Sequence, residues 1–173
     1  MKLRDIVLAI LALSIGASLL VMWLAPGDIR QAPDITVTSV EGRQLALRGL
    51  HGHPVLVNFW STTCPGCVKE IPRLVELHEA YAPRGLEVIG IAMAYDPPSH
   101  VIAFGKARAI PYPLALDIDS RAAAAFGNVQ VTPSSFLIAP DGRVVYRQTG
   151  ELDMDKVRRL VSDMLDDNNS GNG

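Results

Sequence analysis

The sequence predicts an α/β fold in which helices flank a central mixed β-sheet. Two apolar runs typical of buried strands, residues 55–60 and 86–93, are separated by a helical pattern over residues 68–81. Farther along the chain, a predicted β-hairpin precedes a last amphipathic helix over residues 153–165. Strands that alternate with helices favour parallel pairing, and a hairpin adds an antiparallel pair, so we expect a mixed sheet.

The individual elements follow from local patterns. Residues 35–40 and 44–47 alternate apolar and polar side chains around Glu41-Gly42, which predicts a first hairpin. The helix at 68–81 has its apolar side chains at the three- and four-residue spacing of one helical face. Similar criteria predict the other elements: helices over 99–109, with Ser99 as N-cap, and over 120–126, and a hairpin joining 135–139 to 144–148 across Asp141-Gly142.

The N-terminal part predicts a membrane anchor. Residues 6–25 carry no formal charge, and a helix of this length spans about 30 Å, the thickness of a bilayer core. Lys2 and Arg4 precede the apolar segment, so the positive-inside rule keeps residues 1–5 in the cytoplasm. We therefore expect residues 6–25 to span the lipid bilayer once, with the remaining chain on the far side.

A cleaved signal peptide is the alternative. Its candidate site follows Ala25, but Trp23 stands where a small residue is required, and Pro26 comes directly after the site. An uncleaved anchor is therefore favoured. Both interpretations export the domain, and we expect it on the periplasmic or extracytoplasmic face of a bacterial inner membrane.

The exported part is expected to be one domain. Residues 26–33 form a tether, residues 34–167 have the length of a single domain, and the polar tail 168–173 is expected to be disordered. The formal net charge of −2 gives no electrostatic reason to expect nucleic-acid binding.

The two cysteines of the chain form the motif Cys64-Pro-Gly-Cys67, between the strand at 55–60 and the helix at 68–81. At a helix N-terminus, unpaired backbone N–H groups and the helix dipole favour a thiolate. The second sulfur lies one turn further on, within reach of the first. Such a pair can be oxidised, reduced and exchanged with other disulfides.

Other uses of the motif fit less well. A structural zinc site usually has four Cys or His ligands, and only His51 and His53 are near, at an unusual spacing. Covalent haem attachment requires His directly after the second cysteine, where Val68 stands. A structural disulfide that closes so short a loop would stabilise little. We therefore expect redox chemistry with no metal and no cofactor.

The segment from Asn58 to Pro72, which contains this motif, resembles the active-site segment of the thioredoxin fold. More specifically, it is similar to the TlpA/ResA-like membrane-anchored thiol–disulfide oxidoreductases. Further matching motifs occur in the same order: Ala32-Pro-Asp-Ile, Gly85-Leu-Glu-Val-Ile-Gly-Ile, Val131-Thr-Pro-Ser-Ser-Phe-Leu-Ile and Asp141-Gly142. The resemblance implies a thioredoxin-like fold with an N-terminal β-hairpin and a family insertion between Ala94 and Ile118.

The resemblance also implies residue roles. Cys64 is expected to be the exposed nucleophile and Cys67 the buried resolving thiol. Pro133 corresponds to the family's cis-proline beside the disulfide, and Thr132 before it would offer its backbone to a bound peptide. Further support of the active site would come from residues of the motif segment: Trp60, Pro65 and Gly66.

Two positions depart from the family pattern. Thioredoxins usually have a buried acid two residues before the active-site Trp, and this chain has Asn58 there. Another group must therefore accept the proton of Cys67, and the candidates are Glu87 and Asp96. Thr63 replaces the frequent aromatic residue before the first cysteine, which leaves a smaller and more polar rim.

The resemblance implies that the protein reduces disulfides of exported proteins, such as apocytochromes c or copper-site assembly factors. A membrane electron-transfer thiol protein would then reduce its own cysteine pair again. A peroxiredoxin-like peroxidase is one alternative, since Ser61 could supply the hydroxyl that such enzymes need, although Val57 stands where they have proline. A non-catalytic metal or haem chaperone is another, but none of the five Met residues cluster in a soluble motif.

Overall fold

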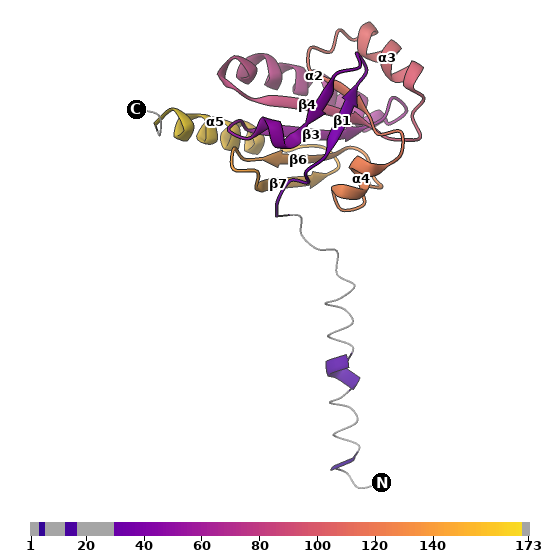
Figure 1. The fold of residues 1–173 in the computed structure, drawn as a ribbon, viewed down its shortest axis with the longest axis vertical. Coiled ribbons are helices and arrows are strands. Elements are labelled where there is room, and N and C mark those ends of the chain that lie inside the picture. The colour runs from indigo at the N-terminus through magenta and orange to yellow at the C-terminus, as the bar shows by residue number, and fades with distance from the viewer. Residues whose placement is uncertain (1–3, 6–12, 17–29, 171–173) are drawn as a thin grey trace.

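The computed structural model describes residues 4–5, 13–16 and 30–170 of the chain, with side chains up to residue 167 at the C-terminal end. Within residues 30–170, seven strands form one sheet in the order β2-β1-β5-β4-β3-β6-β7 (Figure 1). The strands are β1 Thr36–Ser39, β2 Gln44–Ala46, β3 Val55–Trp60, β4 Glu87–Ala92, β5 Leu114–Leu116, β6 Ser134–Ile138 and β7 Val144–Thr149.

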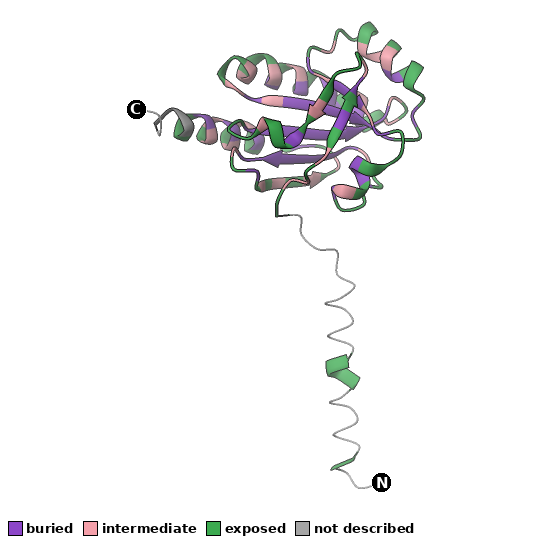
Figure 2. Cartoon of the chain, viewed as in Figure 1, coloured by how far each residue is buried: buried purple, intermediate pink, exposed green. Residues whose placement is uncertain are grey.

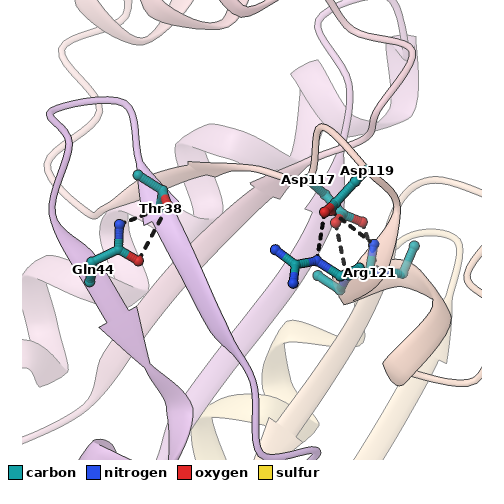
Figure 3. Close-up of polar contacts among 7 residues, drawn as sticks. Thr38, Gln44, Asp117, Asp119 and Arg121 are labelled. Atoms are coloured by element: carbon teal, nitrogen blue, oxygen red, sulfur yellow. Dashed lines mark hydrogen bonds and ion pairs between the residues drawn. The ribbon is translucent and has the colours of Figure 1, made fainter.

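The sheet is mixed, as predicted. The central strand β3 pairs in parallel with β4 and antiparallel with β6, and β4 pairs in parallel with β5. Both predicted hairpins are present, as the antiparallel pairs β1–β2 and β6–β7. In the first hairpin, Thr38 and Gln44 form a cross-strand side-chain hydrogen bond (Figure 3). Strand β5 is an addition to the predicted set of elements.

Helices cover both faces of the sheet. The main helices are α2 Pro65–Tyr81, α3 Pro98–Ala107, α4 Arg121–Ala125 and α5 Met154–Ser170, and the short 3-10 helices are η1 Leu47–Leu50 and η2 Ala82–Arg84. One apolar core lies between the sheet and α2, α3 and α5, and a second lies under α4 and η1. The central strands β3, β4 and β6 are therefore buried almost throughout (Figure 2).

Helix α2 begins at Pro65, three residues before the predicted start at residue 68, and the starts of α3 and α4 also differ from the sequence-based prediction. Helix α3 begins at Pro98 with Pro97 as N-cap, so the prediction of Ser99 as N-cap is wrong. Proline suits the first helical position because its missing N–H would have no partner there. Helix α4 is capped from a distance: the Asp117 carboxylate accepts hydrogen bonds from the N–H groups of Ala122 and Ala123 (Figure 3).

Most of the predicted anchor at residues 6–25 lies outside the described residues. No helix among the described residues is long and apolar enough to cross a membrane. The last tether residues are attached to the domain, since Gln31 forms an isolated β-bridge with Arg143, and the Ala32 N–H donates to the Gly142 carbonyl at 2.9 Å. At the other end, α5 extends to Ser170, beyond the predicted helix end at residue 165.

Candidate functional site

The cysteine motif lies at one edge of the sheet, where β3 ends and α2 begins. Cys64 is the N-cap of α2, and Pro65 is its first residue. Because β6 runs antiparallel to β3, with Phe59 opposite Ser134, the residues just before β6 reach the same edge. The sheet therefore brings Thr132-Pro133 next to the cysteines, although they lie about seventy positions later in the sequence.

The two sulfurs form a disulfide, with the Cα atoms of Cys64 and Cys67 5.3 Å apart. Cys64 is half-buried, whereas Cys67 is only 2% exposed. The Cys67 N–H donates to Cys64 Sγ at 3.1 Å. This N–H and the α2 N-terminus would stabilise a thiolate on Cys64 in the reduced protein. The accessible sulfur is thus the one that the helix start activates.

The proline loop is in contact with the disulfide. The Thr132–Pro133 peptide bond is cis, as predicted. The Thr132 carbonyl oxygen lies 3.5 Å from Cys64 Sγ, close enough to accept a hydrogen bond from a Cys64 thiol. A Cβ at Gly66 would lie 3.6 Å from Pro133 Cδ, so Gly66 faces this proline. Trp60 is buried in the same core cluster as Cys67, and its ring centroid lies 5.4 Å from that of Phe104.

A buried carboxyl that the sequence analysis missed lies on α2, three positions after Cys67. Glu70 is 2% exposed, and its Oε1 accepts a hydrogen bond from the Leu152 N–H at 2.7 Å. Its Oε2 accepts from Asn58 Nδ2 at 3.3 Å, and Asn58 Nδ2 also donates to Ser135 Oγ at 2.8 Å. This network connects α2, β3 and β6 with the segment that leads into α5.

Burial dominates the electrostatics of Glu70. Removal from water raises the pKa of this carboxyl above its ordinary value of 4.5, and the charge of Glu151 adds to the rise. The hydrogen bonds from Leu152 and Asn58 act in the opposite direction, but they do not cancel the effect of burial. Glu70 is therefore a group that can take up or release a proton closer to neutral pH than an exposed glutamate.

Glu70 lies on the same buried face of α2 as Cys67. The two residues are three positions apart on the buried face of α2, and side chains at this spacing are neighbours on a helix. The same spacing could have identified Glu70 from the sequence, because this charged residue interrupts the apolar stripe that contains Ile71 and Leu74.

The structure places the two predicted proton acceptors differently. Asp96 is only 4% exposed and lies in the loop after β4, where its carboxylate accepts hydrogen bonds from the Thr62 N–H and, at 2.6 Å, from the Thr62 hydroxyl. Asp96 thus fastens this loop to the segment before Cys64. Glu87 begins β4 opposite Val55, at the other end of the strand, about 17 Å along the sheet from the edge with the cysteines. It is not part of the site.

The serine and threonine before the cysteines bond to each other. Ser61 Oγ lies 3.0 Å from Thr63 Oγ1 and accepts a hydrogen bond from the Thr63 N–H at 3.2 Å. Ser61 is fully buried, and Thr63 is exposed beside Cys64. The polar rim expected at Thr63 is therefore present, and the Thr63 hydroxyl is oriented by its contact with Ser61.

Comparisons with known proteins agree with this geometry. Residues 29–147 match the AhpC/TSA family. The thiol-disulfide oxidoreductase ResA of Bacillus thuringiensis (strain Al Hakam) is 35% identical over 152 residues, which cover 86% of this chain and 87% of that protein. The ResA protein of Geobacillus thermodenitrificans is 30% identical over 128 residues, covering 74% and 72%.

Solved structures give the same result for the fold. A crystal structure of a thiol:disulfide interchange protein of the thioredoxin family from Chlorobium tepidum is 29% identical and matches with a TM-score of 0.71. The match covers 82% of this chain and 99% of that one. The predicted thioredoxin-like fold is therefore confirmed.

Proposed function

The chain belongs to the AhpC/TSA family and to the ResA-like thiol–disulfide oxidoreductases within it, and on this basis we propose that it reduces disulfides of exported proteins. Its activity is thiol–disulfide exchange through Cys64 and Cys67. The observation that carries the proposal is the difference between the two sulfurs. The sulfur of the half-buried Cys64 accepts a hydrogen bond from the Cys67 N–H in the first turn of α2, whereas Cys67 itself is buried.

The reaction starts from the reduced protein. The Cys64 thiolate attacks one sulfur of a substrate disulfide, whose S–S bond breaks as a new bond to Cys64 forms. One substrate cysteine leaves as a thiolate, and the other is held in a mixed disulfide. The Cys67 thiolate then attacks Cys64 Sγ, releases the second substrate thiolate and closes the Cys64–Cys67 disulfide. Two electrons pass from the protein to the substrate, whose two thiolates are protonated from water.

We assign Glu70 the role of proton acceptor for the Cys67 thiol. Cys67 must lose its proton before it can attack, and it is buried away from water. The Glu70 carboxyl is its neighbour on α2, and burial raises the pKa of that carboxyl toward that of a thiol. Asp96, in contrast, acts through Thr62 by holding the segment that precedes Cys64.

The cellular setting of the proposal comes from the sequence. We propose that residues 6–25 anchor the chain in a bacterial inner membrane and that the domain faces the periplasm or the outside. A membrane electron-transfer thiol protein would restore the dithiol. The substrates would be exported proteins with disulfides, such as apocytochromes c or copper-site assembly factors.

The direction of electron flow is tested by the reduction potential. The full chain is equilibrated with glutathione and dithiothreitol buffers, and the fraction of reduced Cys64–Cys67 is measured by thiol alkylation. A reductase is expected to have a potential well below about −150 mV, whereas a potential near or above this value is that of an oxidant and would contradict the proposal.

A peroxidase of the peroxiredoxin type is the second candidate, because residues 29–147 match the AhpC/TSA family and Ser61 lies three positions before Cys64. The Ser61 hydroxyl bonds to Thr63, and Val57 occupies the position where proline is expected for this activity. We expect the reduced chain to consume hydrogen peroxide no faster than a free thiol does. Rapid consumption that depends on Cys64 would favour the peroxidase.

A further inference from the structure

Three large apolar side chains are exposed close to the disulfide. Tyr95 is 59% exposed, Val131 58% and Ile118 71%. In the described domain, residues 30–170, Val145 is the one other large apolar side chain of this kind, and it is only 37% exposed. We call Tyr95, Ile118 and Val131 the apolar ledge.

The sheet explains why the ledge adjoins the cysteines. Strands β5, β4, β3 and β6 are neighbours in this order, the first three are parallel, and β6 is antiparallel to β3. The ends of β5, β4 and β3 and the start of β6 therefore lie along one edge. The residues that follow or precede these ends are, in spatial order, Ile118, Tyr95, Cys64 and Val131.

Two sets of contacts hold Tyr95 beside the disulfide. Its neighbour Asp96 binds the N–H and hydroxyl of Thr62, two residues before Cys64. The Tyr95 hydroxyl lies 3.4 Å from Thr132 Oγ1, and the carbonyl oxygen of the same Thr132 lies 3.5 Å from Cys64 Sγ. The Tyr95 hydroxyl and Cys64 Sγ thus contact the same residue, Thr132, while Tyr95 remains largely exposed to water.

The carboxylates next to the ledge form hydrogen bonds or ion pairs with other groups of the protein. Next to Ile118, Asp117 caps α4, and Asp119 forms an ion pair with Arg121 at 2.6 Å (Figure 3). The Asp96 carboxylate is buried against Thr62. The buried carboxylates of Asp96 and Asp117 are thus bonded within the protein, and the ledge side chains themselves offer a partner apolar surface to bury.

We propose that Tyr95, together with Val131, determines substrate specificity by binding an apolar side chain next to the substrate's disulfide cysteine. The proposal rests on the proposed thiol–disulfide exchange. Folded proteins bury most apolar side chains beside their cysteines, whereas an unfolded segment exposes them. The partner class is therefore an unfolded, cysteine-containing polypeptide segment, and the ledge disfavours folded proteins and small polar disulfides.

The test compares two disulfide-linked peptides of equal length and charge, with either leucine or serine next to each cysteine. The pre-reduced full chain in detergent is mixed with each peptide, and the second-order rate constant is measured by acid quenching and thiol alkylation. We expect the wild type to react about fivefold faster with the leucine peptide, because the ledge covers part of that side chain. The ratio of the two rate constants within one variant is the readout, so differences in intrinsic thiol reactivity cancel.

Variants assign the preference to the ledge. Tyr95→Ser and Val131→Ser are each expected to reduce the ratio to less than about twofold, and Tyr95→Phe is expected to keep it because the ring remains. Val145→Ser is the matched control. This exposed valine lies on β7 near the opposite edge of the sheet, and its loss should leave the ratio unchanged.

Glutathione disulfide as a third substrate separates the two proposals. If the wild type reacts with glutathione disulfide but treats both peptides alike, or if Tyr95→Ser keeps the full preference, the ledge proposal is overturned and the exchange activity stands. If the wild type reduces none of the three disulfides, the proposed function fails, and the ledge proposal fails with it.

Discussion

Replacing Glu70 by alanine removes the acceptor of two buried donors, the Leu152 N–H and Asn58 Nδ2. A buried donor left without an acceptor costs about 1–3 kcal/mol, so two such donors cost about 2–6 kcal/mol. Asn58 Nδ2 retains its bond to Ser135 Oγ, which places the expected loss in the lower half of that range. The expected decrease in the free energy of unfolding is therefore about 2–3 kcal/mol at low pH.

The loss should depend on pH in a defined direction. Burial raises the pKa of Glu70 in the folded state above the unfolded value of about 4.5, so the folded state binds this proton more tightly. Its contribution to stability is full below about pH 4.5 and decreases as pH rises through the folded-state pKa. Glu70→Ala removes this dependence, so its destabilisation relative to wild type should become smaller as pH increases.

Urea unfolding of the oxidised protein at a series of pH values between about 4 and 8 measures both effects. Glu79→Ala is the control, because Glu79 is an exposed glutamate on the same helix and its loss should change stability by no more than about 0.5 kcal/mol. A Glu70→Ala loss as small as that of the control, or a loss that increases with pH, would refute the reasoning.

Three further predictions concern other contacts. Glu70→Gln should slow the attack of Cys67 on the mixed disulfide by at least about tenfold, measured by quenched-flow alkylation, because a general base is lost; an unchanged rate would exclude Glu70 as the acceptor. Asp96→Ala should lower the free energy of unfolding by about 2 kcal/mol in urea titrations, because the Thr62 N–H and hydroxyl lose their acceptor; unchanged stability would contradict this anchoring. Ser120→Gly should raise stability by about 0.5–1 kcal/mol in the same assay, since Ser120 has a φ of +59° and makes no side-chain cap bond; destabilisation would count against this explanation.

The features that the sequence could predict are those with local causes. Strand β3 has its predicted bounds, 55–60, because an apolar run interrupted only by Asn58 ends in polar residues and the cysteine motif. The hairpins follow from turn dipeptides such as Asp141-Gly142. Strand β5 has three residues and follows two prolines, so neither periodicity nor length distinguishes it from a loop.

The cysteines and the proline loop of the site were predictable because they form motifs in the sequence. Glu70 could be noticed as the charged residue within the apolar stripe of α2, but its hydrogen bond from the Leu152 N–H, 82 positions away, is not encoded near it. Asp96 was a candidate proton acceptor in the sequence, but its hydrogen bonds to Thr62 are visible only in the folded structure. Glu87 was misplaced because the strand direction puts it at the opposite edge.

Trapping of the mixed disulfide tests the central claim most directly. The reduced full chain carrying Cys67→Ser is mixed with a disulfide-linked peptide, and the adduct is identified by mass spectrometry. The assignment of Cys64 as attacker and Cys67 as resolver predicts that this variant accumulates a stable adduct on Cys64 and that Cys64→Ser forms none. An adduct that accumulates on Cys67 in the Cys64→Ser variant, or disulfide reduction at the wild-type rate without Cys64, would contradict it.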